Sequence, residues 1–189
     1  MQNPIIIKGM WDDGIVLDMY IKTSTYLGED AFGHPQFKNE YSEIGKLLHA
    51  MKYNGHFDTS NEIADICLKV ASDWIVNKQI DIILPIPPSI DRVAQPVFMI
   101  GEVLAARLNI HYAEDVLRKT SCNPVKNTPK ENRNISETII QLKSAKRPCN
   151  VLLIDDFFSS GTTANECVRV LKKDPLITKI YYLAIAKTK

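Results

Sequence analysis

The sequence predicts an α/β protein in which a parallel sheet is flanked by helices. Three short runs, at residues 80–86, 150–154 and 179–186, consist mostly of apolar residues, as is typical of strands buried on both faces of a parallel sheet. Amphipathic segments with helical spacing alternate with these runs, and strands that alternate with helices usually form a parallel sheet. The 189 residues, 45% of them hydrophobic, suffice for one such core.

The first part of the chain is predicted to form a small hood beside this core. Residues 14–23 interleave apolar and polar side chains, which is typical of a half-exposed strand. Residues 26–39 contain two glycines and a proline and are interpreted as a loop. Residues 42–53 are predicted to form an amphipathic helix that begins with a capping serine and ends before a glycine. We therefore assign residues 1–57 to the hood and residues 58–189 to the core.

The core is predicted to alternate helices and strands, with one long loop. Residues 119–134 are rich in Ser, Asn, Pro, Lys and Arg and show no apolar period, so they are predicted to form a flexible surface loop that is long enough to act as a lid. The other core elements are expected as helices at residues 59–77, 95–108, 136–142 and 163–172 and as strands at residues 80–86, 110–117, 150–154 and 179–186.

Charge and composition exclude several classes of function. The 23 basic and 22 acidic residues nearly cancel, so no global field attracts nucleic acid or an anionic membrane. No run of eighteen apolar residues occurs, and no signal segment is visible, so a cytoplasmic protein is expected. The four cysteines stand singly and are interpreted as free thiols, most of them buried.

One segment, residues 151–163 (VLLIDDFFSSGTT), carries the clearest chemical signal. A buried strand leads into Asp155 and Asp156, and a hydroxyl-rich turn with one glycine joins it to a helix. In open α/β sheets, ligands bind beyond the carboxyl ends of the strands. The start of the helix offers backbone N–H groups and the positive end of its dipole. The residues expected to hold a phosphate there are Ser159, Ser160, Gly161, Thr162 and Thr163.

The two aspartates point to the rest of the ligand. Asp155 and Asp156 would repel a phosphate, so we expect them to bind vicinal sugar hydroxyls, or Mg²⁺ through water. A ligand with a phosphate at one end, a diol in the middle and a metal ion nearby is a phosphorylated ribose. Two other interpretations remain open, namely a phosphoacceptor receiver domain and a solvated turn without a ligand.

The same thirteen residues resemble the phosphoribosyl pyrophosphate (PRPP) motif of type I phosphoribosyltransferases. The resemblance implies a Rossmann-like sheet with a small N-terminal hood, PRPP as substrate and Mg²⁺ as cofactor. It also implies that Asp155 and Asp156 hold the ribose O2′ and O3′ hydroxyls, with the metal nearby, and that residues 159–163 hold the 5′-phosphate. The protein would then be a pentosyltransferase.

Further stretches are similar to ComF-type phosphoribosyltransferases, a group linked to DNA uptake and competence. These stretches are residues 46–53, 84–87, 117–120 and 184–187. The paired-cysteine zinc module of that family has no counterpart among residues 1–37. The resemblance therefore implies a ComF-like enzyme without the zinc module, and it is compatible with a homodimer.

The remaining site residues are expected to bind the leaving pyrophosphate. We predict that the turn after the strand at residues 80–86 binds pyrophosphate through Pro87, Pro88 and Ser89, with Arg92 beside it. Lys119, at the start of the lid, is a further catalytic candidate, and Arg118, Lys126 and Arg133 are other lid cations.

Two functional hypotheses follow from these residues. The first is a transferase that passes the phosphoribosyl group to a nitrogenous acceptor held by the hood, or hydrolyses it, with release of pyrophosphate. The second is a PRPP-binding sensor or accessory protein without turnover. Pyrophosphate release distinguishes them.

Overall fold

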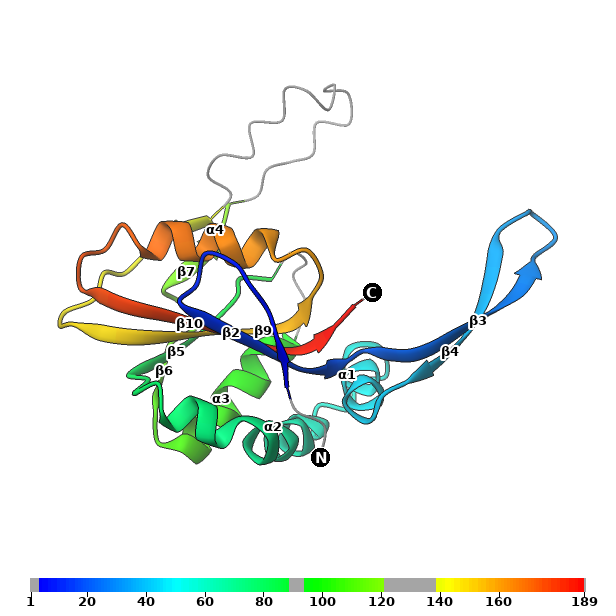
Figure 1. Cartoon of the computed structure of the whole chain (residues 1–189), viewed down its shortest axis with the longest axis horizontal. Coiled ribbons are helices and arrows are strands. Elements are labelled where there is room, and N and C mark those ends of the chain that lie inside the picture. The colour runs from blue at the N-terminus through cyan, green and yellow to red at the C-terminus, as the bar shows by residue number, and fades with distance from the viewer. Residues whose placement is uncertain (1–3, 89–93, 121–138, 189) are drawn as a thin grey trace, which may run out of the picture.

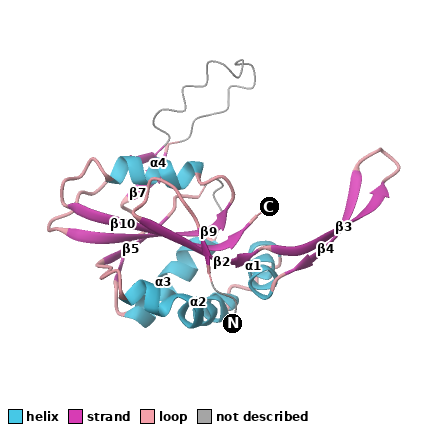
Figure 2. Cartoon of the chain, viewed as in Figure 1, coloured by secondary structure: helices cyan, strands magenta, loops and turns pink. Residues whose placement is uncertain are grey.

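A six-stranded sheet forms the centre of the computed structural model, which describes residues 4–88, 94–120 and 139–188 (Figure 2). Its strands run in the order β1, β2, β10, β9, β5, β6. Only β1, at one edge, is antiparallel to its neighbour, and the other pairs in this sheet are parallel. The predicted α/β fold with a parallel sheet is therefore confirmed. The strands are β1 (Ile5–Ile6), β2 (Asp13–Met19), β5 (Ile82–Pro85), β6 (His111–Tyr112), β9 (Cys149–Phe158) and β10 (Ile177–Lys187).

Helices cover both faces of the sheet, as Figure 1 shows, with α2 and α3 on one face and α4 on the other. Along β9, Leu152 and Ile154 pack with the helices of the first face, while Val151 and Leu153 pack with α4. Successive residues of a strand point to opposite faces, so this central strand is apolar on both sides, as predicted. The helices are α1 (Glu43–Tyr53), α2 (Thr59–Val76), α3 (Pro96–Leu108) and α4 (Thr162–Leu171).

The helix ends follow local capping rules. Ser42 caps α1 as predicted, because its hydroxyl accepts a hydrogen bond from the Gly45 N–H at 2.9 Å. α2 begins after Asp58, whose side chain makes no capping hydrogen bond, and the hydroxyl of Thr59 donates to the carbonyl of His56 at 2.7 Å. In the described part of the chain, no helix is both long enough and apolar enough to cross a membrane.

The predicted loop at residues 26–39 is wrong, because most of it lies in a β-hairpin of β3 (Ile21–Glu29) and β4 (Pro35–Tyr41). Figure 1 shows this hairpin projecting from the body of the molecule. Asp30 builds the turn by accepting the N–H groups of Phe32 and His34 at 2.8 and 3.0 Å. Most residues of both strands are exposed, so the alternation of apolar and polar side chains that reveals a half-buried strand is missing.

A second wrong prediction is the helix at residues 136–142. Its described part contains strand β8 (Ile139–Gln141), which pairs antiparallel with β7 (Leu117–Lys119). Leu117 and Ile139 are both buried in the core below α4, so burial favours the strand pair over a short helix. The predicted strand at residues 110–117 is correspondingly divided between β6 and β7. The predicted lid lies outside the described residues from residue 121 onward.

Three cysteines, Cys67, Cys149 and Cys167, are free thiols, as predicted. Cys67 and Cys167 are buried and Cys149 is half-buried. Cys122 lies outside the described residues.

Candidate functional site

Two adjacent carboxylates at the carboxyl end of β9 have different partners on opposite faces of the sheet. Asp155 and Asp156 are predicted to follow the strand, but β9 continues through both to Phe158. Because successive residues of a strand point to opposite sides, Asp155 meets Tyr182 on the α4 side, and Asp156 meets Lys52 of α1 on the other. The two acids therefore have different partners, although the charge of Asp156 still acts on Asp155.

Asp155 lies beside a buried tyrosine. The hydroxyl of Tyr182, itself fully buried on β10, donates to Asp155 Oδ2 at 2.9 Å. Burial and, next, the charge of Asp156 raise the pKa of Asp155 to about 7, and the hydrogen bond from Tyr182 acts in the opposite direction. Asp155 therefore changes its protonation state near neutral pH.

Asp156 forms an ion pair that is largely shielded from solvent. Lys52 Nζ lies 2.6 Å from Asp156 Oδ2, and the two side chains are only 12% and 19% exposed. The same ammonium group lies 3.9 Å from the centre of the Phe157 ring, within range of a cation–π interaction. No sequence pattern predicted Lys52 as a site residue, because a lysine on an amphipathic helix is ordinarily a surface residue.

Both carboxylates open into one cleft of about 280 Å³. Of the predicted site residues, the cleft brings Asp155, Asp156 and Thr163 together with Pro87 and Pro88. Its further lining residues are Lys52, Ile86, Gln95, Pro96, Val97 and Phe157. Carboxylates and a helix N-terminus on one side of this cleft thus face a proline turn on the other.

The turn between β9 and α4 has the geometry of an anion loop. Gly161 adopts a left-handed conformation (φ 73°) just before α4, and a Cβ there would lie 2.9 Å from the Phe158 ring. Only glycine fits this position without strain. The hydroxyls of Ser160 and Thr162 lie 2.9 Å apart, and both side chains are exposed, as is that of Ser159. The Thr162 N–H makes a long contact of 3.5 Å with Ser160 Oγ. The exposed hydroxyls and the other N–H groups of the first turn of α4 can donate to a phosphate.

Trp11 supports this loop from below. Its ring stacks on Tyr182 at 4.6 Å between centroids and meets the edge of Phe158 at 6.3 Å. It also lies under Gly161, since a Cβ there would be 3.4 Å from the indole. The neighbouring Met10 N–H donates to Asn165 Oδ1 at 2.7 Å. The N-terminal segment therefore braces both the loop and the tyrosine that binds Asp155, and no sequence pattern had indicated this role.

The proline turn has few donors for an anion. Pro85, Pro87 and Pro88 have no amide hydrogen. The N–H of Ile86 is already used, because it donates to the carbonyl of Ile154 at 2.8 Å. Ser89, the remaining predicted residue of this turn, lies outside the described residues.

Of the two predicted catalytic cations, Lys119 is not among the described residues that line the cleft. Arg92 lies outside the described residues. Lys119 lies on β7, on the α4 side of the sheet, where its charge acts on the Cys167 thiol. Burial raises the pKa of that thiol, and Lys119 partly opposes the effect. The described residues therefore leave Lys52 as the cation that lines the cleft.

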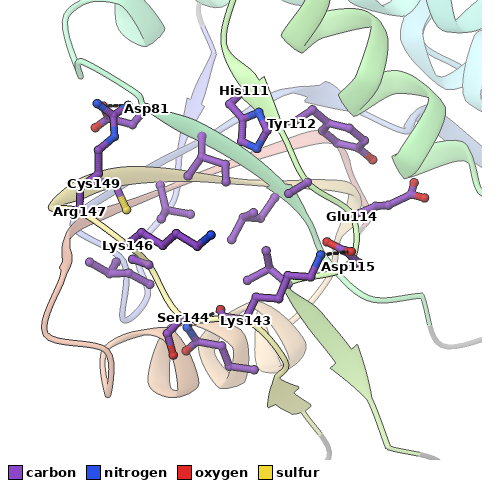
Figure 3. Close-up of a pocket in the computed structure, with 18 of the residues that line it drawn as sticks. Asp81, His111, Tyr112, Glu114, Asp115, Lys143, Ser144, Lys146, Arg147 and Cys149 are labelled. Carbon is purple, nitrogen blue, oxygen red and sulfur yellow. Dashed lines mark hydrogen bonds and ion pairs between the residues drawn. The ribbon is translucent and has the colours of Figure 1, made fainter.

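A second cavity of about 840 Å³ has none of the predicted site residues among its described lining residues (Figure 3). It is lined by the first residues of several parallel strands, including Ile82, Cys149 and Ile177. Ligands of such sheets bind at the opposite, carboxyl ends. We therefore place the candidate site in the cleft beside Asp155 and Asp156.

Tyr182→Phe is expected to raise the pKa of Asp155 above its value of about 7, because a hydrogen bond that favours the ionised form is lost. The variant should also lose about 1–2 kcal/mol of unfolding free energy at pH 8, where Asp155 is mostly ionised, and less at pH 5. Titration of the Asp155 carboxyl carbon by NMR and denaturation at both pH values measure these effects. Tyr181→Phe on the same strand is the control, and an unchanged Asp155 titration in Tyr182→Phe would contradict the assignment.

No protein-family model and no curated protein sequence matches the chain. Adenine phosphoribosyltransferase from Saccharomyces cerevisiae, solved with an imino-altritol bisphosphate and adenine, is 14% identical with a TM-score of 0.47, covering 87% of this chain and 84% of that one. The Trypanosoma brucei enzyme, solved with AMP, pyrophosphate and ribose-5-phosphate, is 13% identical with a TM-score of 0.47, covering 89% and 78%. A hypoxanthine phosphoribosyltransferase from Staphylococcus aureus is 16% identical with a TM-score of 0.45, covering 68% and 64%.

Proposed function

We propose that this protein is a phosphoribosyltransferase that binds Mg·PRPP in the cleft beside Asp155 and Asp156. It would transfer the phosphoribosyl group to a nitrogenous acceptor, or to water, and release pyrophosphate. The observation that carries this proposal is the position of the two carboxylates and the start of α4 in one cleft at the carboxyl end of the central strand.

Each part of the site suits one part of the donor. Residues 159–163 would hold the 5′-phosphate through hydroxyls and backbone N–H groups. Asp155 and Asp156 would accept hydrogen bonds from the vicinal ribose hydroxyls, because an ionised carboxylate accepts and does not donate. The bond from C1 to the pyrophosphate oxygen would break with its electron pair passing to pyrophosphate, while a bond from C1 to the acceptor nitrogen or to a water oxygen forms. The proton that this nitrogen or water loses would pass to the released pyrophosphate or to solvent.

The carboxylates also suit Mg²⁺, which prefers oxygen ligands. Among the described residues, no group of three or more Asp, Glu, His or Cys side chains forms a metal centre. Asp155 and Asp156 would therefore hold the ion together with waters and oxygens of the donor, which is the usual way in which Mg²⁺ binds at phosphate sites. When bound, the metal would supply positive charge to the leaving pyrophosphate.

The finer assignments belong to the same proposal. The protein would be a cytoplasmic, ComF-like enzyme in which residues 1–57 form the hood and residues 58–189 the catalytic core, with β1 and β2 of the first segment joining the central sheet. The hood would hold the acceptor, and α1 supports this arrangement because it already contributes Lys52 to the cleft. A homodimer is compatible with these assignments.

A second candidate function is PRPP binding without turnover, as in a sensor. The proline turn favours it, since residues 85–88 offer no amide hydrogen to a departing pyrophosphate. Pyrophosphate release measured across a panel of nucleobases and amines separates the two functions.

Asp155→Asn together with Asp156→Asn is expected to abolish Mg·PRPP binding measured by calorimetry, because both acceptors of the ribose hydroxyls are weakened and the metal loses its protein ligands. Asp58→Asn with Asp73→Asn removes the same charge from exposed positions and should bind normally. Circular dichroism checks the fold of both variants. Unchanged affinity in the Asp155 and Asp156 double variant would refute the proposed donor site.

A further inference from the structure

Among the described residues that line the cleft, Lys52 is the one cation. PRPP would bring several negative charges into this cleft, where Asp155 and Asp156 already stand. Charges of like sign at close range disfavour binding unless positive groups offset them. Lys52 is thus placed where the electrostatics of the donor require positive charge.

The described part of the proline turn offers no unused backbone N–H group for that compensation. Three of the four residues from Pro85 to Pro88 lack an amide hydrogen, and the fourth donates to Ile154. Among the described residues of the cleft, Lys52 is the cationic donor, with three N–H groups on a flexible stem.

Lys52 is held in the cleft by two independent contacts. One is the ion pair with Asp156 at 2.6 Å, and the other is the Phe157 ring at 3.9 Å from Nζ. The ring of Phe157 is itself fixed edge-on by Tyr20, with 4.7 Å between the ring centres. Loss of the ion pair would therefore leave the ammonium group over the aromatic ring and inside the cleft.

We infer that Lys52 changes partner when the donor binds: it neutralises Asp156 in the empty cleft and then donates to the pyrophosphate group of PRPP. The inference rests on the proposed function and adds a catalytic residue to it. The ribose hydroxyls take the place of Lys52 at Asp156, so donor binding frees the ammonium group. No proton is transferred in this exchange, and Lys52 stays positively charged while negative charge develops on the departing pyrophosphate.

Lys52→Met tests the inference by comparing PRPP with two of its parts. Calorimetry in the presence of Mg²⁺ would measure binding of PRPP, inorganic pyrophosphate and ribose 5-phosphate. We expect the affinities for PRPP and pyrophosphate to fall by about 10- to 100-fold, which corresponds to the loss of a charge-assisted hydrogen bond. The affinity for ribose 5-phosphate should change by less than about 3-fold, because that ligand has no pyrophosphate.

Two further variants separate charge from packing. Lys52→Arg keeps the charge and should retain PRPP affinity to within about 5-fold of the wild type. Lys46→Met removes a lysine from the exposed face of the same helix and should bind all three ligands normally. Equal losses for PRPP and ribose 5-phosphate in Lys52→Met would overturn the inference, because Lys52 would then act only by supporting Asp156.

The wild-type protein gives a readout that does not depend on the folding of a variant. Mg²⁺ with inorganic pyrophosphate should shift the NMR signal of the Lys52 ammonium nitrogen, and no shift at saturation would overturn the inference. If the wild-type protein binds PRPP but the NMR signal of the Lys52 ammonium nitrogen does not shift, only this inference is refuted. A wild-type protein that does not bind PRPP would refute the proposed function as well.

Discussion

Asp155→Asn is expected to weaken Mg·PRPP binding by about 30- to 100-fold and, at pH 8, to raise the melting temperature by roughly 5 °C. The loss of affinity follows from the loss of a charged acceptor for a ribose hydroxyl and of a metal ligand. The gain in stability follows from the burial of Asp155 next to Asp156, which makes its ionised form unfavourable. A penalty on the order of 2 kcal/mol corresponds to such a temperature shift in a protein of this size.

The pH dependence of the melting temperature distinguishes removal of the Asp155 charge from a general stabilisation of the fold. The pKa of Asp155 rises from 3.8 to about 7 on folding, so its contribution to stability is fully present below about pH 4 and is lost as the pH rises through 7. The Asp155→Asn variant has no carboxyl group to ionise and so does not lose this stability at high pH. It should melt near the wild-type temperature at pH 5 and above it at pH 8. Melting curves at the two pH values test this. A lower melting temperature than the wild type at pH 8 would contradict the assigned environment.

Asp156→Asn is the matched comparison, and its expected effect on stability is opposite. It breaks the ion pair and leaves Lys52, which is only 12% exposed, without its carboxylate partner. Removing one partner of a shielded pair destabilises a protein because the other charge stays buried. The two aspartates are neighbours in sequence. Changes of opposite sign in the melting temperatures of their Asn variants would therefore show that their partners, and not their position, determine their effects on stability.

Trp11→Ala is expected to reduce the free energy of unfolding by about 3–5 kcal/mol, as is usual for deletion of a large buried aromatic side chain. Trp11 is 6% exposed and packs on both Tyr182 and Phe158. The affinity for ribose 5-phosphate should also fall, by about 10-fold, because Gly161 and its turn lose their support. Urea denaturation and calorimetry measure the two effects.

Trp74→Ala provides a control for the second effect. Trp74 is half-buried on α2, donates to Asp13 and packs against Tyr181, away from the turn that precedes α4. The Trp74→Ala variant should be less stable than the wild type. Its affinity for ribose 5-phosphate should be unchanged when the wild type and the variant are measured well below their melting temperatures. Equal affinities of the Trp11→Ala and Trp74→Ala variants would mean that Trp11 does not support the phosphate loop.

The part of the site that could be predicted from sequence is the part that is contiguous. Asp155, Asp156 and residues 159–163 stand in one stretch whose residue types each have a local chemical meaning. The side chains that set the behaviour of these residues come from elsewhere in the chain. Tyr182 lies 27 positions from Asp155, and Lys52 comes from the helix before the core.

The fold was predictable where strands are apolar and continuous. The β3–β4 hairpin was missed because it is polar and exposed on both faces. The extension of β9 was missed for a related reason. Acidic residues at a strand end were interpreted as the beginning of a turn, whereas pairing with β10 continues from Asp155 opposite Ala184 to Phe158 opposite Lys187.

The pleat of β9 has a consequence for how this site can vary among proteins. The acid that meets a phenol and the acid that meets an ammonium group are separated by a single peptide unit. Insertion or deletion of one residue before Asp155 in this strand would exchange the faces of the two acids and hence their partners. We therefore expect changes in length to be confined to the connecting segments, since one extra residue between Val151 and Asp155 would turn each acid toward the other's partner.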